Sequence, residues 1–251
     1  MPPYAPPFSP RSEGESPIDG LRRRVRALEG AQGLAAGQGV ALGLPLLDRH
    51  LPWGGLPRGA LHEVLGDAGP ATLFAVALAA RLAGSEGDIL WCARNGALDA
   101  GLPCPAGLAA IGLDPARLVL VTARSDADAL WAMEEGLRSR AVAAVIGEVV
   151  EASLTATRRL ALAAEANGAA LLLRPDAGDP PPSAAATRWR IAAAPAVPDT
   201  GLPRFRADLF RCRGAAPGAW LMGWCDEAGG LAVSAALHGG TADPAPARLA
   251  G

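Results

Sequence analysis

Short apolar runs alternate with amphipathic stretches along the middle of this chain. Five runs have the length and composition of strands, at residues 60–65, 88–93, 117–122, 142–146 and 169–173. Four of them are almost continuously apolar, which is typical of strands covered on both faces. Helix-like stretches lie between them, at residues 71–83, 126–140 and 154–166. This alternation predicts an α/β fold with a mostly parallel central sheet flanked by helices.

The pattern changes after Pro175. Residues 176–183 have the composition of a loop, and four strand-like segments follow, at residues 187–192, 206–213, 219–224 and 231–235. Successive strands joined by short turns are typical of an antiparallel meander. The sequence therefore predicts antiparallel strands added at the C-terminal edge of the sheet.

The ends of the chain differ in composition from this body. Residues 1–18 are rich in proline, serine and charge, and residues 19–29 predict a short helix with Leu21, Val25 and Leu28 on one face. We expect a disordered N-terminus with this helical arm and a linker at residues 1–39, one domain at residues 40–238 and a disordered tail at residues 239–251. The chain of 251 residues has a net charge of −2 and neither a membrane-spanning run nor a signal peptide, so we expect it in the cytoplasm.

The first strand, the glycines after it and the next helix have the layout of a phosphate-binding P-loop. A working loop reads G-x-x-x-x-G-K-[ST]; its backbone N–H groups and lysine bind phosphates, and its hydroxyl binds Mg²⁺. Counted from Gly66, with Gly69 inside the turn, the second glycine falls on Ala71, the lysine on Thr72 and the hydroxyl on Leu73. The chain contains no lysine at all. The sequence therefore predicts a degenerate P-loop.

The cysteines and histidines form no recognisable metal or redox motif. Their spacings contain no C-x-x-C pair and no histidine cluster; the residues are Cys92, Cys104, Cys212, Cys225, His50, His62 and His238. We interpret the cysteines as reduced thiols, mostly in strands, and His62 as a structural side chain. No metal and no cofactor is expected.

Several longer blocks carry a family resemblance. They are LPRGALHEVLG (56–66), GLDPARLVLVTARSDADALWAMEEGLRS (112–139), LTATRRLALAAE (154–165), AATRWRI (185–191) and LFRCRGAAPGAWL (209–221). Over roughly residues 40 to 225 the chain resembles the ImuA family, RecA-like accessory proteins of bacterial damage-induced mutagenesis. The resemblance implies that the predicted sheet is a RecA-like core.

Compared with active recombinases, the resemblance also implies that catalysis has been lost. The position of the glutamate that activates water falls on Arg94, and that of the metal-binding acid falls on Gly147 or Glu148. An arginine cannot act as a general base. Glu148 is either the metal-binding acid or an exposed carboxylate at a strand end, and we favour the exposed carboxylate. The connections that would hold DNA-binding loops are short and offer no basic or aromatic contact surface. We expect no catalytic residue and no enzyme activity.

The family implies partners as well. Such proteins act beside a catalytically inactive Y-family-like polymerase homologue and an error-prone replicative-type DNA polymerase, and contact the polymerase homologue and RecA recombinase. Leu21, Val25 and Leu28 are then candidates for docking on the recombinase. Two rival functions remain open. A RecA- or RadA-type ATPase with an atypical site would bind nucleotide, and a SulA-like division inhibitor would cause cell filamentation.

Arginines recur at alternate positions in the C-terminal strands and so share faces in pairs. The pairs are Arg188 with Arg190, Arg204 with Arg206, and Arg211 with Arg213. If these strands are neighbours, the six side chains line one surface. That surface is either an ordinary solvated face or a site for DNA or an acidic partner.

We expect different degrees of burial for two tryptophans. Trp53 lies in a turn rich in glycine and proline, so we expect it to be exposed and count it as a partner-binding candidate. Trp131 lies in a predicted helix with apolar neighbours, and we expect it in the core.

Overall fold

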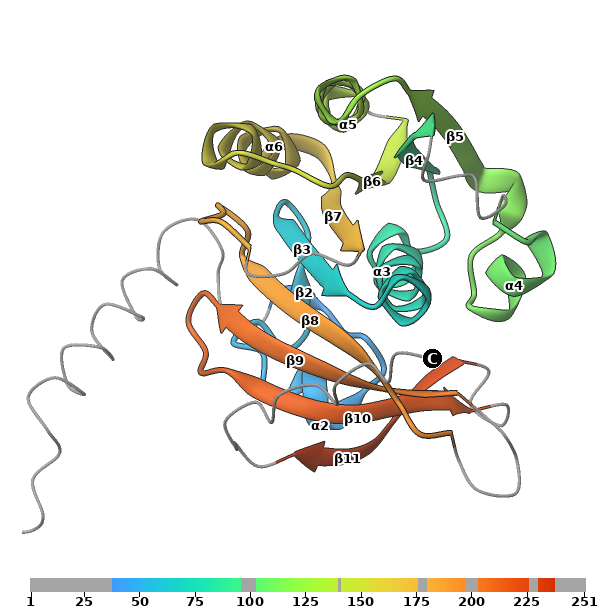
Figure 1. Ribbon diagram of the computed structural model, residues 1–251, viewed down its shortest axis with the longest axis vertical. Helices are drawn as coiled ribbons and strands as arrows, with labels where there is room; N and C mark the ends of the chain where they lie inside the picture. The colour runs from blue at the N-terminus through green and yellow to red at the C-terminus, as the bar shows by residue number, and fades with distance from the viewer. Residues whose placement is uncertain are drawn as a thin grey trace, which may run out of the picture.

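A computed structural model describes residues 38–95, 103–139, 141–175, 180–196, 203–225 and 230–237. Within them, one sheet contains nine strands: β3 (Leu61–Gly66), β4 (Asp88–Arg94), β5 (Leu118–Ala123), β6 (Val142–Glu148), β7 (Ala169–Pro175), β8 (Thr187–Ala194), β9 (Arg204–Cys212), β10 (Gly218–Cys225) and β11 (Gly230–Leu237). Their order across the sheet is β11-β10-β9-β8-β3-β7-β6-β4-β5 (Figure 1). These nine strands correspond to the nine predicted from the sequence.

The sheet has a parallel half and an antiparallel half. Strands β3, β7, β6, β4 and β5 pair in parallel and form the parallel half, whereas β9, β10 and β11 are added in antiparallel pairs. Strand β8 pairs in parallel with β3 and antiparallel with β9, and we count it with the antiparallel half. The predicted α/β fold with an antiparallel C-terminal edge is confirmed. One detail was wrong: β8, which the turn pattern assigned to the meander, pairs in parallel with β3 on its other side.

Helices cover both faces of the parallel half. Helix α3 (Ala68–Ala83) packs on one face, and helices α5 (Asp126–Arg138) and α6 (Leu154–Asn167) pack on the other (Figure 1). The first turns of α5 and α6 are capped, because Ser125 Oγ accepts a hydrogen bond from the N–H of Asp128 at 3.2 Å and Ser153 Oγ accepts one from Ala156 at 3.1 Å. Apolar strand residues are therefore buried on both sides of these strands.

The antiparallel half is covered differently. The segment around helix α2 (Pro45–Asp48) contributes Leu42, Leu47 and Leu51 to the same core cluster as Trp189 and Phe205 from β8 and β9. Helices α5 and α6 lie over the parallel strands and do not extend over β9 to β11 (Figure 1). The opposite faces of β9 and β10 therefore carry partly exposed side chains.

Smaller elements complete the described chain. Strands β1 (Gly39–Val40) and β2 (Leu56–Pro57) form a separate antiparallel pair, and helix α4 (Pro105–Ala110) and the 3₁₀ helix η2 (Pro115–Arg117) precede β5. The predicted domain boundaries at residues 39 and 238 adjoin parts of the chain outside the described residues and stay predictions. Among the described helices, none combines the length and apolar character needed to cross a membrane.

Candidate functional site

The turn that resembles a P-loop is almost absent. Strand β3 ends at Gly66 and helix α3 begins at Ala68, so a single residue, Asp67, lies between them. We predicted that the helix begins at Ala71, and this was wrong: Ala68, Gly69 and Pro70 form its first turn. The predicted Gly-rich turn therefore belongs largely to the helix.

Hydrogen bonds to the backbone of β8 hold this turn tightly against that strand, so that no open loop remains; we call this the closed junction. Gly66 has a φ of +118°, and a Cβ at this position would lie 1.9 Å from the carbonyl oxygen of Ile191. The N–H of Asp67 donates to that oxygen at 3.0 Å, and the carboxylate of Asp67 accepts a hydrogen bond from the N–H of Ala193 at 2.6 Å. Only glycine fits at Gly66, because a side chain would collide with the backbone of β8.

This geometry leaves little for a phosphate to bind. In a P-loop, successive backbone N–H groups of an open loop surround the anion. Here Pro70 has no N–H, the N–H of Ala71 already donates to Asp67 O at 2.9 Å, and an exposed carboxylate stands at the start of the helix. Ala71 is fully buried, and Thr72 and Leu73 are half-buried.

Two further residues stand where the resemblance implied catalytic acids. The side chain of Arg94, at the end of β4, lies 3.9 Å from the carboxylate of Asp126 at the start of α5. Glu148, at the end of β6, was expected to be exposed but is half-buried, on the face of the sheet that carries α3. Burial raises the pKa of the Glu148 carboxyl, and the neighbouring Trp91 lowers it in part.

A buried ionic cluster, which the sequence reading missed, joins the two halves of the sheet. Glu63 of β3 is fully buried and contacts Arg174 of β7 at 3.1 Å and Arg188 of β8 at 2.6 Å. Arg174 also donates to the carbonyl of Val150, and Arg188 donates to that of Pro181. One signal was available: a glutamate inside an apolar strand covered on both faces must find a cationic partner.

The same cluster contacts two connections between elements of the sheet, through the carbonyls of Val150 and Pro181. Val150 lies in the connection from β6 to α6, and Pro181 in the connection from β7 to β8. These are the connections that would hold DNA-binding loops according to the family resemblance. Each is tied to the buried Glu63 through one arginine.

His62 also lies at the boundary between the halves. Trp189 Nε1–H donates to Thr187 Oγ1 at 2.9 Å, Thr187 Oγ1–H donates to His62 Nδ1 at 2.8 Å, and His62 Nε2–H donates to Pro57 O at 3.0 Å. Burial lowers the pKa of His62 to about 4. A neutral ring with both nitrogens engaged fits the structural role expected for it.

The six C-terminal arginines lie on neighbouring strands but do not form one surface. Arg188 is 5% exposed and belongs to the Glu63 cluster, so its expected place on the surface was wrong. The register pairs Arg188 with Arg211, and a bulge follows that places Phe210 beside them. The ring of Phe210 lies 5.1 Å from the guanidinium of Arg188 and 5.5 Å from that of Arg190.

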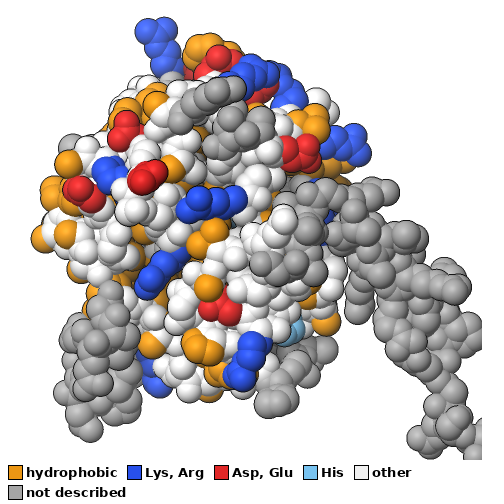
Figure 2. Space-filling view, turned by 180° about the vertical axis from the view of Figure 1, so that it is seen from behind, with side chains coloured by type: hydrophobic (Ala, Val, Ile, Leu, Met, Phe, Trp, Pro, Cys, Tyr) orange, Lys and Arg blue, Asp and Glu red, His pale blue; other side chains and the backbone are white. Residues whose placement is uncertain are grey.

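The remaining arginines differ in what they contact. Arg204 donates to Pro195 O at 2.8 Å, and Arg213 donates to Ala184 O at 2.7 Å. Nε–H of Arg206 donates to both carboxylate oxygens of Asp208, at 2.8 and 2.9 Å. Arg190 and Arg211 are exposed. On the face seen in Figure 2, positive side chains are scattered rather than gathered in one stripe.

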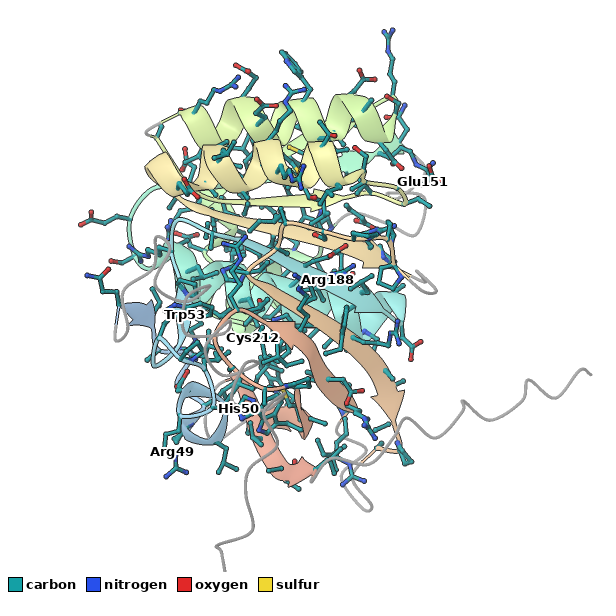
Figure 3. All side chains as sticks on the ribbon, turned by 90° about the vertical axis from the view of Figure 1, so that its left-hand side faces the viewer. Arg49, His50, Trp53, Glu151, Arg188 and Cys212 are labelled. Atoms are coloured by element: carbon teal, nitrogen blue, oxygen red, sulfur yellow. The ribbon has the colours of Figure 1, made fainter. Side chains whose placement is uncertain are left out.

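Both tryptophan expectations were wrong. Trp53 is 2% exposed and packs with Ala60 and Ala186, because the turn that holds it folds back against the sheet (Figure 3). Trp131 is 62% exposed on α5, since it lies on the side of the helix turned away from the sheet. The arm residues Leu21, Val25 and Leu28 lie outside the described residues.

The described thiols are free. Burial raises the pKa of Cys92, in β4, and of Cys212, in β9, to about 12 each. Cys104 is exposed before α4, and hydrogen bonds from the backbone of Gly107 and Ala106 lower its pKa. The described residues bring no three His, Cys, Asp or Glu side chains together in a way that would hold a metal ion.

Fold and site together define an α/β protein with a P-loop-like strand–helix junction that lacks the phosphate-binding loop and its lysine. The chain is 39% identical over 205 residues to Protein ImuA of Caulobacter vibrioides, in two strains, and the alignment covers 73% of this chain and 82% of the relative. The chain belongs to the ImuA family. No family model matches it.

Proposed function

We propose that this protein is a non-catalytic accessory protein of damage-inducible, error-prone translesion DNA synthesis. Its recombinase-like core serves as a binding platform in the cytoplasm and has no ATPase activity. Family membership supports the process in which it acts. The observation that carries the non-catalytic part is the strand–helix junction at Gly66 to Ala68, which is closed by hydrogen bonds to β8.

The remaining parts of a nucleotide site agree with this proposal. A P-loop ATPase needs a lysine to neutralise the phosphates and a carboxylate to activate water. This chain has no lysine, and Arg94 stands at the position implied for the carboxylate. The exposed carboxylate of Asp67 at the start of α3 repels a phosphate that approaches the helix N-terminus.

The proposed partners are a catalytically inactive Y-family-like polymerase homologue and RecA recombinase. An error-prone replicative-type DNA polymerase is reached indirectly, through the polymerase homologue. The N-terminal residues Leu21, Val25 and Leu28 are proposed to dock on the recombinase. The antiparallel half of the sheet is proposed as a second contact surface, because it leaves arginine and aromatic groups accessible on a face that α5 and α6 do not cover.

The test of the process is the frequency of ultraviolet-induced mutation in a strain that lacks this gene. We expect induced mutation to collapse in the deletion and to return when the intact gene is restored. Complementation with a Leu21→Ala, Val25→Ala, Leu28→Ala variant then tests the arm. Unchanged induced mutation in the deletion strain, with altered cell division or recombination, would overturn the proposal.

The test of the non-catalytic part is titration with a fluorescent ATP analogue in the presence of Mg²⁺. We expect no saturable binding by the wild-type protein. We also expect none by a Thr72→Lys, Leu73→Thr variant, because the restored side chains extend from a regular helix and not from an open loop. Saturable binding by the wild-type protein would favour an ATPase with an atypical site.

A further inference from the structure

Strand β11 forms one border of the sheet, and its outer edge is free. It pairs with β10 alone, and no hydrogen bond from another described element reaches its main chain (Figure 1). Natural proteins often protect such an edge with charged residues, proline or a bulge. Residues 230–237 contain no charge and no proline, and the bulge in their pairing with β10 lies before Ala235. The last three residues, Ala235 to Leu237, are therefore a regular and unprotected strand edge.

An open pocket of about 500 Å³ adjoins this end of β11. Leu46 and His50, from the α2 segment, line it on the core side of the sheet, and His50 lies beside the antiparallel strands in Figure 3. Arg206 and Asp208 line it from the opposite face, because the alternate residues of β9 are the ones that face the core. The pocket therefore opens around the end of the sheet, where Ala236 and Leu237 also line it.

One part of this pocket is suited to an apolar side chain. Leu46 is 42% exposed, although its neighbour Leu47 is fully buried in the core. Ala236 is exposed, and Leu237 and Phe210 are half-buried. Apolar groups that line a concave surface and stay accessible to solvent are typical of a binding site for another apolar group.

The wall of the pocket at β10 is held in place by close packing. A Cβ at Gly218 would lie 2.7 Å from the ring of Trp220 and 2.9 Å from Nε2 of His50. His50 contacts the carbonyl of Ala216 at 2.8 Å and packs edge-on against Trp220, with ring centroids 5.0 Å apart. A ligand therefore meets a surface that is already formed, which lowers the cost of binding.

The charged groups of the lining are already engaged. Nε–H of Arg206 donates to both carboxylate oxygens of Asp208, and Arg190 also interacts within the protein. The lining therefore gives no reason to expect a ligand of either charge. What it offers is an apolar surface beside a row of free main-chain groups.

We propose that this site binds an extended segment of a partner protein. The segment adds a strand beside Ala235, Ala236 and Leu237 and places one aliphatic or aromatic side chain in the pocket against Leu46. A free strand edge presents N–H and C=O groups that the main chain of another strand satisfies, and a pocket for one of its side chains supplies specificity. This inference rests on the proposed accessory function, because a protein without catalysis acts through what it binds.

The experiment is selection of a displayed library of random dodecapeptides on the full-length protein, followed by affinity measurement with the synthesised peptides. We expect the selected sequences to share one large apolar residue within a segment of strand-forming residues. Leu46→Glu in the pocket and Ala236→Lys at the strand edge should each weaken binding by roughly ten-fold or more. Both residues are exposed, so thermal melting curves close to that of the wild type should show that the variants fold.

Two variants serve as matched controls. Leu162→Glu changes an exposed leucine on α6, and Val119→Glu changes an exposed valine on β5, the strand at the other border of the sheet. Both should bind the peptides as the wild type does. Hydrogen exchange adds a local readout: bound peptide should slow the exchange of amides at residues 235–237 and leave those of β5 unchanged.

Strand addition predicts a further pattern that other binding modes do not produce. Successive main-chain N–H groups of an added strand point alternately toward β11 and away from it. Methylating the backbone nitrogens of a selected peptide one at a time should therefore weaken binding at every second residue near the apolar anchor. Equal effects at neighbouring residues would contradict strand addition.

Other outcomes would also overturn the inference. They are a selection that yields no binder, peptides that bind the Leu46→Glu and Ala236→Lys variants as tightly as the wild type, and no change in exchange at residues 235–237. A dimer of the free protein that both variants abolish would assign the site to a second copy of this chain instead. The proposed function fails separately, since it is contradicted by normal induced mutation in the deletion strain.

Discussion

The two halves of the sheet differ in how their faces are covered. The parallel half, where α/β proteins ordinarily bind ligands at the carboxyl ends of their strands, is covered on both faces, and its strand–helix junction at Gly66 is closed. The antiparallel half is covered by the α2 segment on one side and carries accessible arginine and aromatic groups on the other. The accessible arginine and aromatic groups therefore belong to the other half of the sheet from the closed strand–helix junction.

Buried polar groups join the halves and keep this arrangement fixed. Glu63 and His62 belong to β3, and their partners Arg188 and Thr187 belong to β8. Removing one member of such a buried pair is costly, because the other member then remains buried without a compensating charge or hydrogen bond. The boundary between the halves should therefore be far more sensitive to substitution than either outer surface.

The largest effect is expected from Gly66→Val at the closed junction. The new side chain would collide with the carbonyl of Ile191 and require a backbone conformation that valine rarely adopts. We expect a loss of more than about 5 kcal/mol of stability, which leaves little folded protein. Soluble yield and circular dichroism measure this. Gly69→Ala, where a Cβ meets nothing within 4 Å, should fold normally, and equal behaviour of the two variants would show that the junction is open.

The next effect is expected from Glu63→Gln. The substitution removes the charge that compensates Arg174 and Arg188, both almost fully buried. We expect a loss of about 3 to 5 kcal/mol in the free energy of unfolding, measured by denaturant titration. Glu135→Gln, which breaks an exposed ion pair with Arg138, is the control and should cost less than about 1 kcal/mol. Similar losses in both variants would contradict a special role for the boundary cluster.

A smaller effect on stability, which depends on pH, is expected from His62. Burial lowers its pKa from 6.5 to about 4, so the folded protein holds the neutral ring and the unfolded chain protonates first as the pH falls. The neutral ring makes its full contribution to the free energy of unfolding above pH 6.5. That contribution is lost as the pH falls toward 4, and the total loss is about 3 kcal/mol. Unfolding free energies of the wild type and of His62→Gln across this range measure it. The same slope for both proteins would be the contrary result.

The smallest effect on stability is expected from Arg190→Glu in the antiparallel half. Its side chain is exposed, and surface substitutions usually change stability by less than about 0.5 kcal/mol. A thermal melting curve close to that of the wild type would show that the exposed surface of this half contributes little to folding. A loss as large as that of Glu63→Gln would contradict the difference between the halves.

Local pattern predicted much of this fold from the sequence. Apolar runs located the nine strands to within a few residues. The start of α3 was wrong because glycine and proline suggest a turn, whereas Pro70 fits in the first turn of a helix, where its missing N–H costs nothing. The two tryptophans were wrong because burial depends on what packs against a side chain and not on its neighbours in sequence.

The sequence by itself determined the α/β class, the strand positions, the family and the loss of the P-loop lysine, since periodicity and residue identity are local properties. Only the tertiary structure decided that the P-loop turn is closed by β8, that Glu63 holds two connections, and that the arginine row is broken. Each of these depends on contacts between residues more than 100 positions apart in the chain, such as Glu63 with Arg174 and Arg188. Such contacts are set by strand order and register, which no local pattern encodes.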